Sequence, residues 1–221
     1  MNPKIYRYVV KTDQGSAPNP CDGYCTLAIC KPGIRKTASV GDWVVGFRSG
    51  SDNQVIYAMQ VSETMTFTDF WRDQRFESRK PLSSPLSDNI YRPDGKGHLK
   101  QVDNQVHAKK RKTIDRDLST INVLISKKFW YFGNNSPKFD QNLNHLVHQG
   151  IGHSVHINRR DSDVSSLEKW LSPHGTVGVH GNPVNLREGV SFSIENGHAS
   201  VLDLQNQNDP RLSHSKCSST C

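Results

Sequence analysis

The 221-residue chain contains no long apolar run and no apolar stretch near its amino terminus. A membrane-spanning helix needs about 20 consecutive apolar residues, and no segment approaches that length. The opening residues, Met1 to Tyr8, alternate polar and apolar side chains and do not resemble a signal peptide. These two absences predict a soluble, cytoplasmic protein that has no membrane partner.

The common catalytic signatures are also missing. The chain has no G-x4-G-K-[ST] phosphate loop, no G-x-S-x-G nucleophile elbow and no H-E-x-x-H zinc motif. Their absence excludes the most frequent nucleoside triphosphatase, hydrolase and metalloprotease interpretations. No segment indicates a cofactor, so none is expected.

Cysteine is scarce and occurs in an odd number, five. In a protein without a secretory signal these side chains should be reduced thiols. The spacing of Cys21, Cys25 and Cys30, C-x3-C-x4-C, departs from the C-x2-C zinc knuckle. We therefore expect small buried hydrophobic side chains and no metal site.

Positive charge is abundant and unevenly distributed. The chain has 28 Lys and Arg against 21 Asp and Glu, a net charge of +7, and residues 98–128 contribute +5 of it through eight cations and three anions. Such a block fits a phosphate backbone, and a solvated loop is the alternative. The predicted phosphate-binding residues are Arg35, Lys109, Lys110, Arg111, Lys112, Lys127 and Lys128.

The hydrophobic pattern predicts strands separated by helices. Strands are expected over 5–10, 25–30, 43–47 and 55–61, the last two as a hairpin, and again over 123–126 and 129–133. Thr66 is a candidate N-cap, with Asp69 three residues on, for a helix whose core stripe is Phe67, Phe70 and Trp71. Further helices are expected over 139–147 and from Asp163, and short strands over 191–194 and 199–202.

These elements predict an α+β fold, with a curled, mostly antiparallel sheet or small β-barrel and inserted helices. One domain is expected over 1–204, with its core over 4–155 and a long basic loop over 81–116, where periodicity is lost. Residues 205–221 read as a flexible polar tail.

Two polar residues stand where a nucleobase could be recognised. Asp42 beside Trp43 could accept a base N–H while the indole stacks on the ring, although a turn carboxylate and a core Trp are the alternative. Asn19, between two prolines, could present its amide to a base edge or close a turn.

Aromatic side chains suggest a base pocket in two further segments. Tyr91 lies between Asn89 and Arg92, where a stacking ring and polar neighbours could hold a base, and a purely anchoring Tyr is the alternative. Trp130 belongs to an aromatic run that follows two lysines. Some of these rings must pack in the core.

One histidine is a candidate general acid or base. His153 follows Gly150 and Gly152, where the backbone can approach a ligand, and a hydrogen-bonded structural histidine is the alternative. Cys25 and a histidine could form a nucleophile pair, but no sequence pattern brings them together.

Several motifs occur in order along residues 4–155. They are Tyr6-Arg-Tyr, Asp13 to Pro20, Gly23 to Ala28, Cys30 to Arg35, Gly41-Asp-Trp-Val-x-Gly46, Asp88-Asn-Ile-Tyr-Arg-Pro93 and Phe129-Trp-Tyr-Phe-Gly133. In these motifs the sequence resembles the second type of nucleotide modification associated domain, which implies a role beside systems that modify or police DNA bases in bacteria and phages.

A weaker likeness connects the segment from Gly41 to Glu63 with PUA and EVE domains, small β-barrels that hold modified bases in an aromatic pocket. The long basic insertion and the helical carboxy-terminal third depart from that pattern. The likeness implies a base pocket around Asn19, Asp42, Trp43 and Trp130.

Three hypotheses about function follow. The first is a binding module that holds a modified or flipped base in an aromatic pocket while the basic loop contacts phosphates, DNA more than RNA. The second is an enzyme that alters a base or nucleotide with His153 and either Asp42 or Cys25. The third is a scaffold that binds partner proteins of a modification system.

Overall fold

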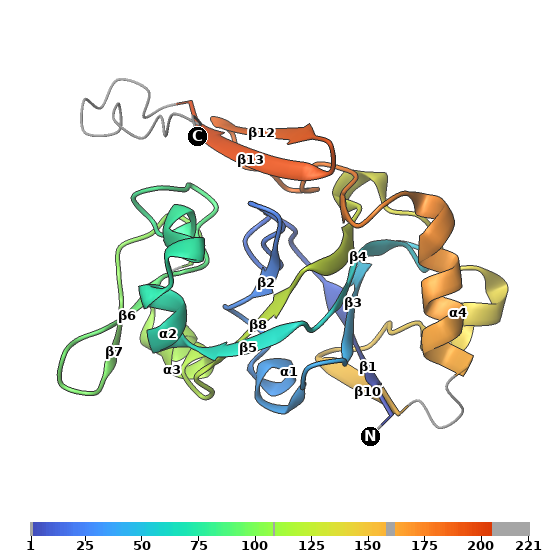
Figure 1. Ribbon diagram of the computed structural model, residues 1–221, viewed down its shortest axis with the longest axis horizontal. Coiled ribbons are helices and arrows are strands. Elements are labelled where there is room, and N and C mark those ends of the chain that lie inside the picture. The colour runs from blue at the N-terminus through green and yellow to red at the C-terminus, as the bar shows by residue number, and fades with distance from the viewer. Residues whose placement is uncertain (1, 108, 158–161, 205–221) are drawn as a thin grey trace, which may run out of the picture.

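The computed structural model describes residues 2–107, 109–157 and 162–204 (Figure 1). Its largest sheet has six strands in the order β10-β1-β3-β4-β9-β11. Three neighbouring pairs are antiparallel, and the β1–β3 and β9–β11 pairs are parallel. The strands are β1 (Lys4–Val10), β3 (Trp43–Arg48), β4 (Val55–Gln60), β9 (Lys128–Tyr131), β10 (His153–Ile157) and β11 (Gly178–Val179).

Both faces of this sheet are covered, since successive strand residues point to opposite sides. In β1, Tyr6 and Tyr8 belong to one apolar cluster and Ile5 to another. The Ile5 side is covered by the 3-10 helix η3 (Gln141–Leu146) and by α4 (Ser162–Leu171), seen beside the sheet in Figure 1. Strand alternation thus produces two separate cores.

Smaller sheets surround the Tyr8 side. One has the order β2-β8-β5, and the hairpins β6-β7 and β12-β13 form the other two. The β12-β13 hairpin lies across the top of the molecule in Figure 1 and contributes Phe192 and Ala199 to the Tyr8 cluster. The bounds are β2 (Cys25–Leu27), β5 (Glu63–Thr66), β6 (Tyr91–Pro93), β7 (Leu99–Gln101), β8 (Asn122–Ser126), β12 (Val190–Glu195) and β13 (His198–Asp203).

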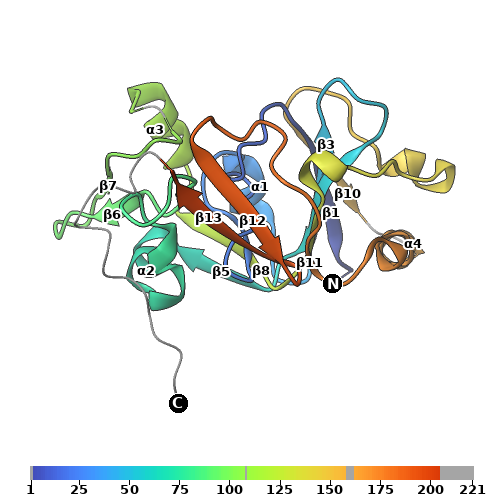
Figure 2. The same ribbon diagram turned by 90° about the horizontal axis from the view of Figure 1, so that it is seen from above.

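Short helices close the remaining sides. In Figures 1 and 2, α1 lies between α3 and the edge formed by β1 and β10. A third apolar cluster, which includes Phe67, Phe70 and Tyr91, packs beneath the β2-β8-β5 sheet. The bounds are α1 (Pro32–Thr37), α2 (Phe67–Arg72), η1 (Gln74–Arg79), α3 (Arg111–Asp117), η2 (Gly133–Asn135) and η4 (Ser172–His174).

The α+β class, the 43–61 hairpin and the Thr66 cap are confirmed. The backbone N–H of Asp69 donates to Thr66 Oγ1 at 3.1 Å. The curled sheet and the β-barrel are both wrong: β10 and β11 are the opposite ends of the six-stranded sheet, and no sheet within the described residues is closed or strongly curled. Two parallel pairs replace the hairpin connections that closure of a small antiparallel barrel would use.

Three local expectations differ from the structure. The segment 81–116 contains β6, β7 and most of α3, while 139–147 forms the 3-10 helix η3 rather than an α-helix. Trp71 is only half-buried, under Lys80, whose Nζ lies 4.5 Å from the ring centroid. Strands β12 and β13 form their own sheet and do not extend the large one. The predicted tail, 205–221, lies outside the described residues.

Candidate functional site

A cavity of about 690 Å³ opens where five segments meet. These are the end of β1 with the following loop, the junction between β2 and α1, the residues before position 108, the last turn of α3, and the start of β10. Its apolar wall includes Tyr8, Val10, Ile29 and Ile151. Ligand-binding pockets are commonly about 300–1,000 Å³, so this volume suits a nucleotide-sized molecule.

The described lining of this cavity is cationic and contains no Asp or Glu. Lys11, Lys31 and Arg116 reach it from three different segments, and none forms an ion pair with a described residue. The Lys31 ammonium lies 4.2 Å from the centroid of the Tyr8 ring. Burial is the main cause that lowers the pKa of Lys31; Lys11 and Arg116 add to it, and Cys30 acts in the opposite direction. Three cations that repel one another form a site for an anion.

A cysteine, a histidine and an aspartate meet at one wall of the cavity. The Cys30 sulfur, a ring nitrogen of His107 and a carboxylate oxygen of Asp117 all lie within 4.8 Å of one another. His107 Nδ1 is 2.9 Å from Asp117 Oδ2. Burial alone would lower the pKa of His107, but Asp117 and Cys30 outweigh it and raise the pKa to about 9. His107 is therefore an imidazolium at neutral pH.

A buried arginine, Arg35, binds the backbone of this group. Arg35 has no exposed surface, and its guanidinium donates to the carbonyls of Cys30 (2.8 Å), Asn122 (2.8 Å) and Asp117 (2.6 Å). Asp117 is equally buried and accepts hydrogen bonds from the Tyr91 hydroxyl at 3.1 Å and the Cys30 N–H at 3.1 Å. Burial lowers the pKa of Arg35 to about 10, which leaves it charged at neutral pH.

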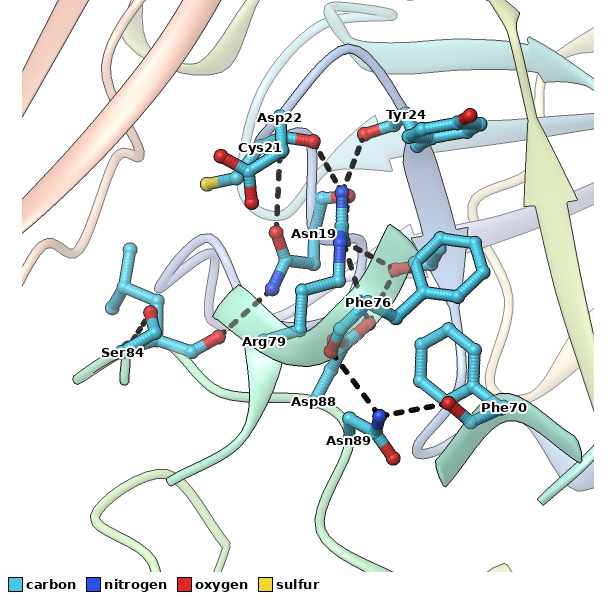
Figure 3. A network of polar contacts seen from close by, with 12 residues as sticks. Asn19, Cys21, Asp22, Tyr24, Phe70, Phe76, Arg79, Ser84, Asp88 and Asn89 are labelled. Carbon is cyan, nitrogen blue, oxygen red and sulfur yellow. Dashed lines mark hydrogen bonds and ion pairs between the residues drawn. The ribbon is translucent and has the colours of Figure 1, made fainter. Parts of the chain in front are cut away.

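A second buried arginine network surrounds Arg79 and has no border with the cavity (Figure 3). Arg79 is 1 % exposed and donates to the carbonyls of Asn19 (3.2 Å), Tyr24 (3.0 Å) and Cys21, and to Thr26 Oγ1. Its Nη1 lies 3.8 Å from Oδ2 of the fully buried Asp88, which also accepts from Thr26 Oγ1. Neither Arg79 nor Asp88 borders the cavity. This network ties the β2 loop to the segment that follows η1.

Three of the predicted base-pocket residues lie around the large sheet. Asp42 accepts from the N–H groups of Lys4 (2.8 Å) and Ser39 (2.9 Å), and so holds the turn before β3. Trp43 and Trp130 stack with ring centroids 6.4 Å apart in the α4-covered core. The Trp130 Nε1–H donates to the Gly175 carbonyl at 3.0 Å.

The other three predicted base-pocket residues are buried in different parts of the fold. Asn19 donates to the Leu86 carbonyl at 2.9 Å, beside Arg79 (Figure 3). Asn89 donates to the Phe70 carbonyl at 2.9 Å, and Tyr91 reaches Asp117. The structure therefore does not gather the six side chains into one pocket. Their role in base binding stays a prediction.

The predicted phosphate-binding residues are also dispersed. Lys109, Lys110, Arg111 and Lys112 are exposed at the start of α3, where Lys109 pairs with Asp103 (3.0 Å) and Arg111 with Asp115 (2.9 Å). Arg35 is buried as described above. The last two lie at the start of β9. The Lys127 Nζ is 5.6 Å from the centroid of the Tyr24 ring, and Lys128 forms an ion pair with Glu168 at 2.6 Å. Contact with phosphate stays a prediction for this set.

His153 lines the cavity, but its predicted partners do not. It lies opposite Tyr8 in the β1–β10 pair, while Asp42 contacts Lys4, four residues or about 13 Å away along β1. Cys25 is fully buried, and burial raises the pKa of its thiol. The His153 ring packs against the backbone of α1, since a Cβ on Gly33 would lie 2.6 Å from its Cε1. Burial and Lys31 lower the pKa of His153.

The Cys30, His107 and Asp117 group was not predicted. Its members are far apart in sequence: Cys30 and Asp117 are separated by 87 positions. The local signal is the run Cys30-Lys31-Pro32-Gly33, which follows β2 after a short connection and leads into the amino terminus of α1. Cys21 and Cys25, which share a spacing motif with Cys30, belong to the apolar core.

A second group that could hold a metal ion lies away from the cavity. Asp163 of α4 accepts from His145 at 3.0 Å and from His156 at 2.7 Å. These are ordinary distances for hydrogen bonds between the side chains, which explains the cluster without an ion.

The fold and cavity define an α+β domain with a cationic pocket at one edge of a mixed sheet. The profile of the nucleotide modification associated domain 2 family matches residues 2–189, and the chain belongs to this family. The resemblance seen in the sequence is thereby confirmed. Comparison with curated proteins and with solved structures gives no match. Within the described residues no helix has the length and apolar character that spanning a membrane requires.

Proposed function

We propose that this domain binds a nucleotide, free or extruded from a nucleic-acid strand, in the cavity beside α1. The carrying observation is the convergence of Lys11, Lys31 and Arg116 on a cavity whose described lining has no carboxylate. A phosphate among them would offset both the burial of the Lys31 ammonium, which is the main cause of its lowered pKa, and its repulsion by Lys11 and Arg116.

The remaining lining suits a base. Apolar side chains such as Val10 and Ile29 offer a dry surface, and Cys30 and His153 supply polar groups at its margin. A base in a duplex must first unstack, at a cost of a few kcal/mol, so a single strand or a free nucleotide should bind more tightly. Family membership supports this ligand class, because the family is associated with nucleotide modification.

The finer form of the proposal is a reader or modifier of DNA bases in a modification or defence system. Here the exposed basic residues 109–112 extend the contact along the strand beyond the cavity. They lie in the same segment as Arg116, just after His107. Phosphates that leave the cavity on this side would meet cations in succession.

Titration of short single-stranded DNA at two or more salt concentrations tests the proposal. Lys31→Gln and Arg116→Gln should each weaken binding and reduce the slope of log K against log salt by about 0.7. Lys169→Gln is the matched control, because Lys169 is an exposed cation of α4 that neither lines the cavity nor belongs to the basic segment 109–112, and Lys110→Gln tests that segment. Unchanged affinity in Lys31→Gln and Arg116→Gln would refute the cavity as the site, and loss in Lys110→Gln alone would place binding on the exposed segment.

A further inference from the structure

Cys30 differs from the other described cysteines in exposure and in backbone conformation. Cys21 and Cys25 are 5 % and 0 % exposed, whereas Cys30 is half-buried and lines the cavity. Cys30 and Lys31 both adopt positive φ, 60° and 43°, which residues other than glycine rarely do. Two successive residues in this region mark a backbone held by its surroundings, a feature concentrated at functional sites.

The surroundings that hold Cys30 are the Arg35 and Asp117 network. The Cys30 N–H donates to Asp117 Oδ1 at 3.1 Å, and its carbonyl accepts from Arg35 Nε at 2.8 Å. Both anchors are completely buried. The backbone of Cys30, a residue that lines the cavity, is thus held in a rigid frame, as a residue that carries a reacting atom requires.

The side chain of Cys30 has a histidine and an aspartate beside it. The Cys30 sulfur, a ring nitrogen of His107 and a carboxylate oxygen of Asp117 all lie within 4.8 Å of one another, and His107 Nδ1 is 2.9 Å from Asp117 Oδ2. Thiolates beside an imidazolium are the nucleophiles of many cysteine enzymes.

We infer that Cys30 is a nucleophile that adds to C6 of a pyrimidine nucleotide bound in the cavity, with His107 as its proton partner. The inference rests on the proposed function, since the cavity must first bind the nucleotide. Pyrimidines fit because their C5=C6 double bond is conjugated with C4 and accepts a soft nucleophile. Purines have no equivalent double bond that is conjugated in this way.

The step balances within the protein and the nucleotide. The Cys30 thiolate forms the S–C6 bond, the π electrons of C5=C6 move to C5, and C5 takes a proton from the His107 imidazolium. In the reverse direction neutral His107 takes back the proton that it gave, or solvent water removes the hydrogen on the other face of C5, and the S–C6 bond breaks. In D2O each cycle can replace the hydrogen at C5 by deuterium, with no oxidant, reductant or co-reactant.

Hydrogen exchange at C5 of dCMP and dUMP, followed by proton NMR in D2O, tests this inference. The wild-type protein should deplete the H5 signal, and Cys30→Ser should leave it at the rate of the free nucleotide. His107→Gln should slow exchange by roughly 100-fold and remove the alkaline limb of its pH profile. Cys217→Ser is the matched thiol control and should exchange like wild type.

Binding of dCMP and dUMP is measured by titration in the same samples, so that two failures are distinguishable. Bound nucleotide without exchange above the Cys30→Ser level overturns the nucleophile and leaves the binding proposal intact. Absence of binding overturns the proposed function, and the nucleophile with it. Since His107→Gln could unfold, the pH dependence of Cys30 alkylation by iodoacetamide in the wild type gives a second readout. A Cys30 rate equal to that of Cys217 would also refute the inference.

Discussion

The molecule contains two buried arginine networks of almost the same composition and of different accessibility. In each, a guanidinium donates to several backbone carbonyls beside a fully buried aspartate. Around Arg79 every partner is internal, whereas the Arg35 network continues through Asp117 to Cys30 and His107 at the cavity. The same kind of hydrogen bonds connects loops in the Arg79 network and fixes the backbone of a cysteine at the cavity in the Arg35 network. What distinguishes a structural network from a candidate reactive one is its border with the cavity.

The largest expected effects come from removing either guanidinium. Arg79→Met and Arg35→Met should each lower the free energy of unfolding by about 3–5 kcal/mol, because each leaves several buried carbonyls without donors and a buried aspartate without its neighbouring cation. Urea denaturation measures this loss. Only Arg35→Met should also slow alkylation of Cys30 in the folded protein. If Arg79→Met slows it equally, the two networks are not separate.

A pH dependence of stability should belong to the Arg35 network. The pKa of His107 is raised to about 9 in the folded state from about 6.5, so the folded state binds the proton more tightly. The resulting stabilisation, roughly 2–3 kcal/mol, should be complete below about pH 6.5 and be lost as pH rises through 9.

The difference in unfolding free energy between wild type and His107→Gln across this range isolates the effect. Buried cysteines titrate in the unfolded state of both proteins and cancel. A difference that does not change with pH would contradict the assigned environment of His107.

Replacing each buried aspartate by asparagine should distinguish the two networks with a smaller loss of stability than removing either arginine. Asp117→Asn and Asp88→Asn keep the side-chain shape and should each cost about 1–3 kcal/mol. Proton NMR of the imidazole should show the His107 pKa returning toward about 6.5 in Asp117→Asn alone. The same fall in Asp88→Asn would show coupling between the networks.

The smallest effects should come from the cysteines themselves. Cys25→Ser places a hydroxyl in an apolar core and should cost about 1–3 kcal/mol, while Cys30→Ser, at the half-buried cavity wall, should cost under about 0.5 kcal/mol. Thermal denaturation compares them. A larger loss in Cys30→Ser would make Cys30 a packing residue.

Local patterns predicted local structure well. The apolar run over 55–61 and the Thr66 to Asp69 spacing identified β4 and the start of α2, because both depend on neighbours in sequence. The parallel pairing of β1 with β3 depends on the path of the intervening chain, and no periodicity reports it. The expected barrel failed for that reason.

The candidate site was predicted only in part, for a related physical cause. His153 was chosen from flanking glycines, and it does line the cavity. Cys30 and His107 could not be joined, because their proximity results from the tertiary fold, in which Asp117 lies beside both. The residues chosen by aromatic character, such as Trp43, lie in cores that those same aromatic rings build.

One measurement tests the contrast between the networks most directly: alkylation of each cysteine in the native protein, with and without dCMP, located by peptide mass spectrometry. The account predicts that Cys30 reacts, that dCMP protects it, and that Cys21, beside Arg79, stays unmodified in both samples. Equal modification of Cys30 and Cys21, or a Cys30 rate indifferent to saturating dCMP, would contradict it.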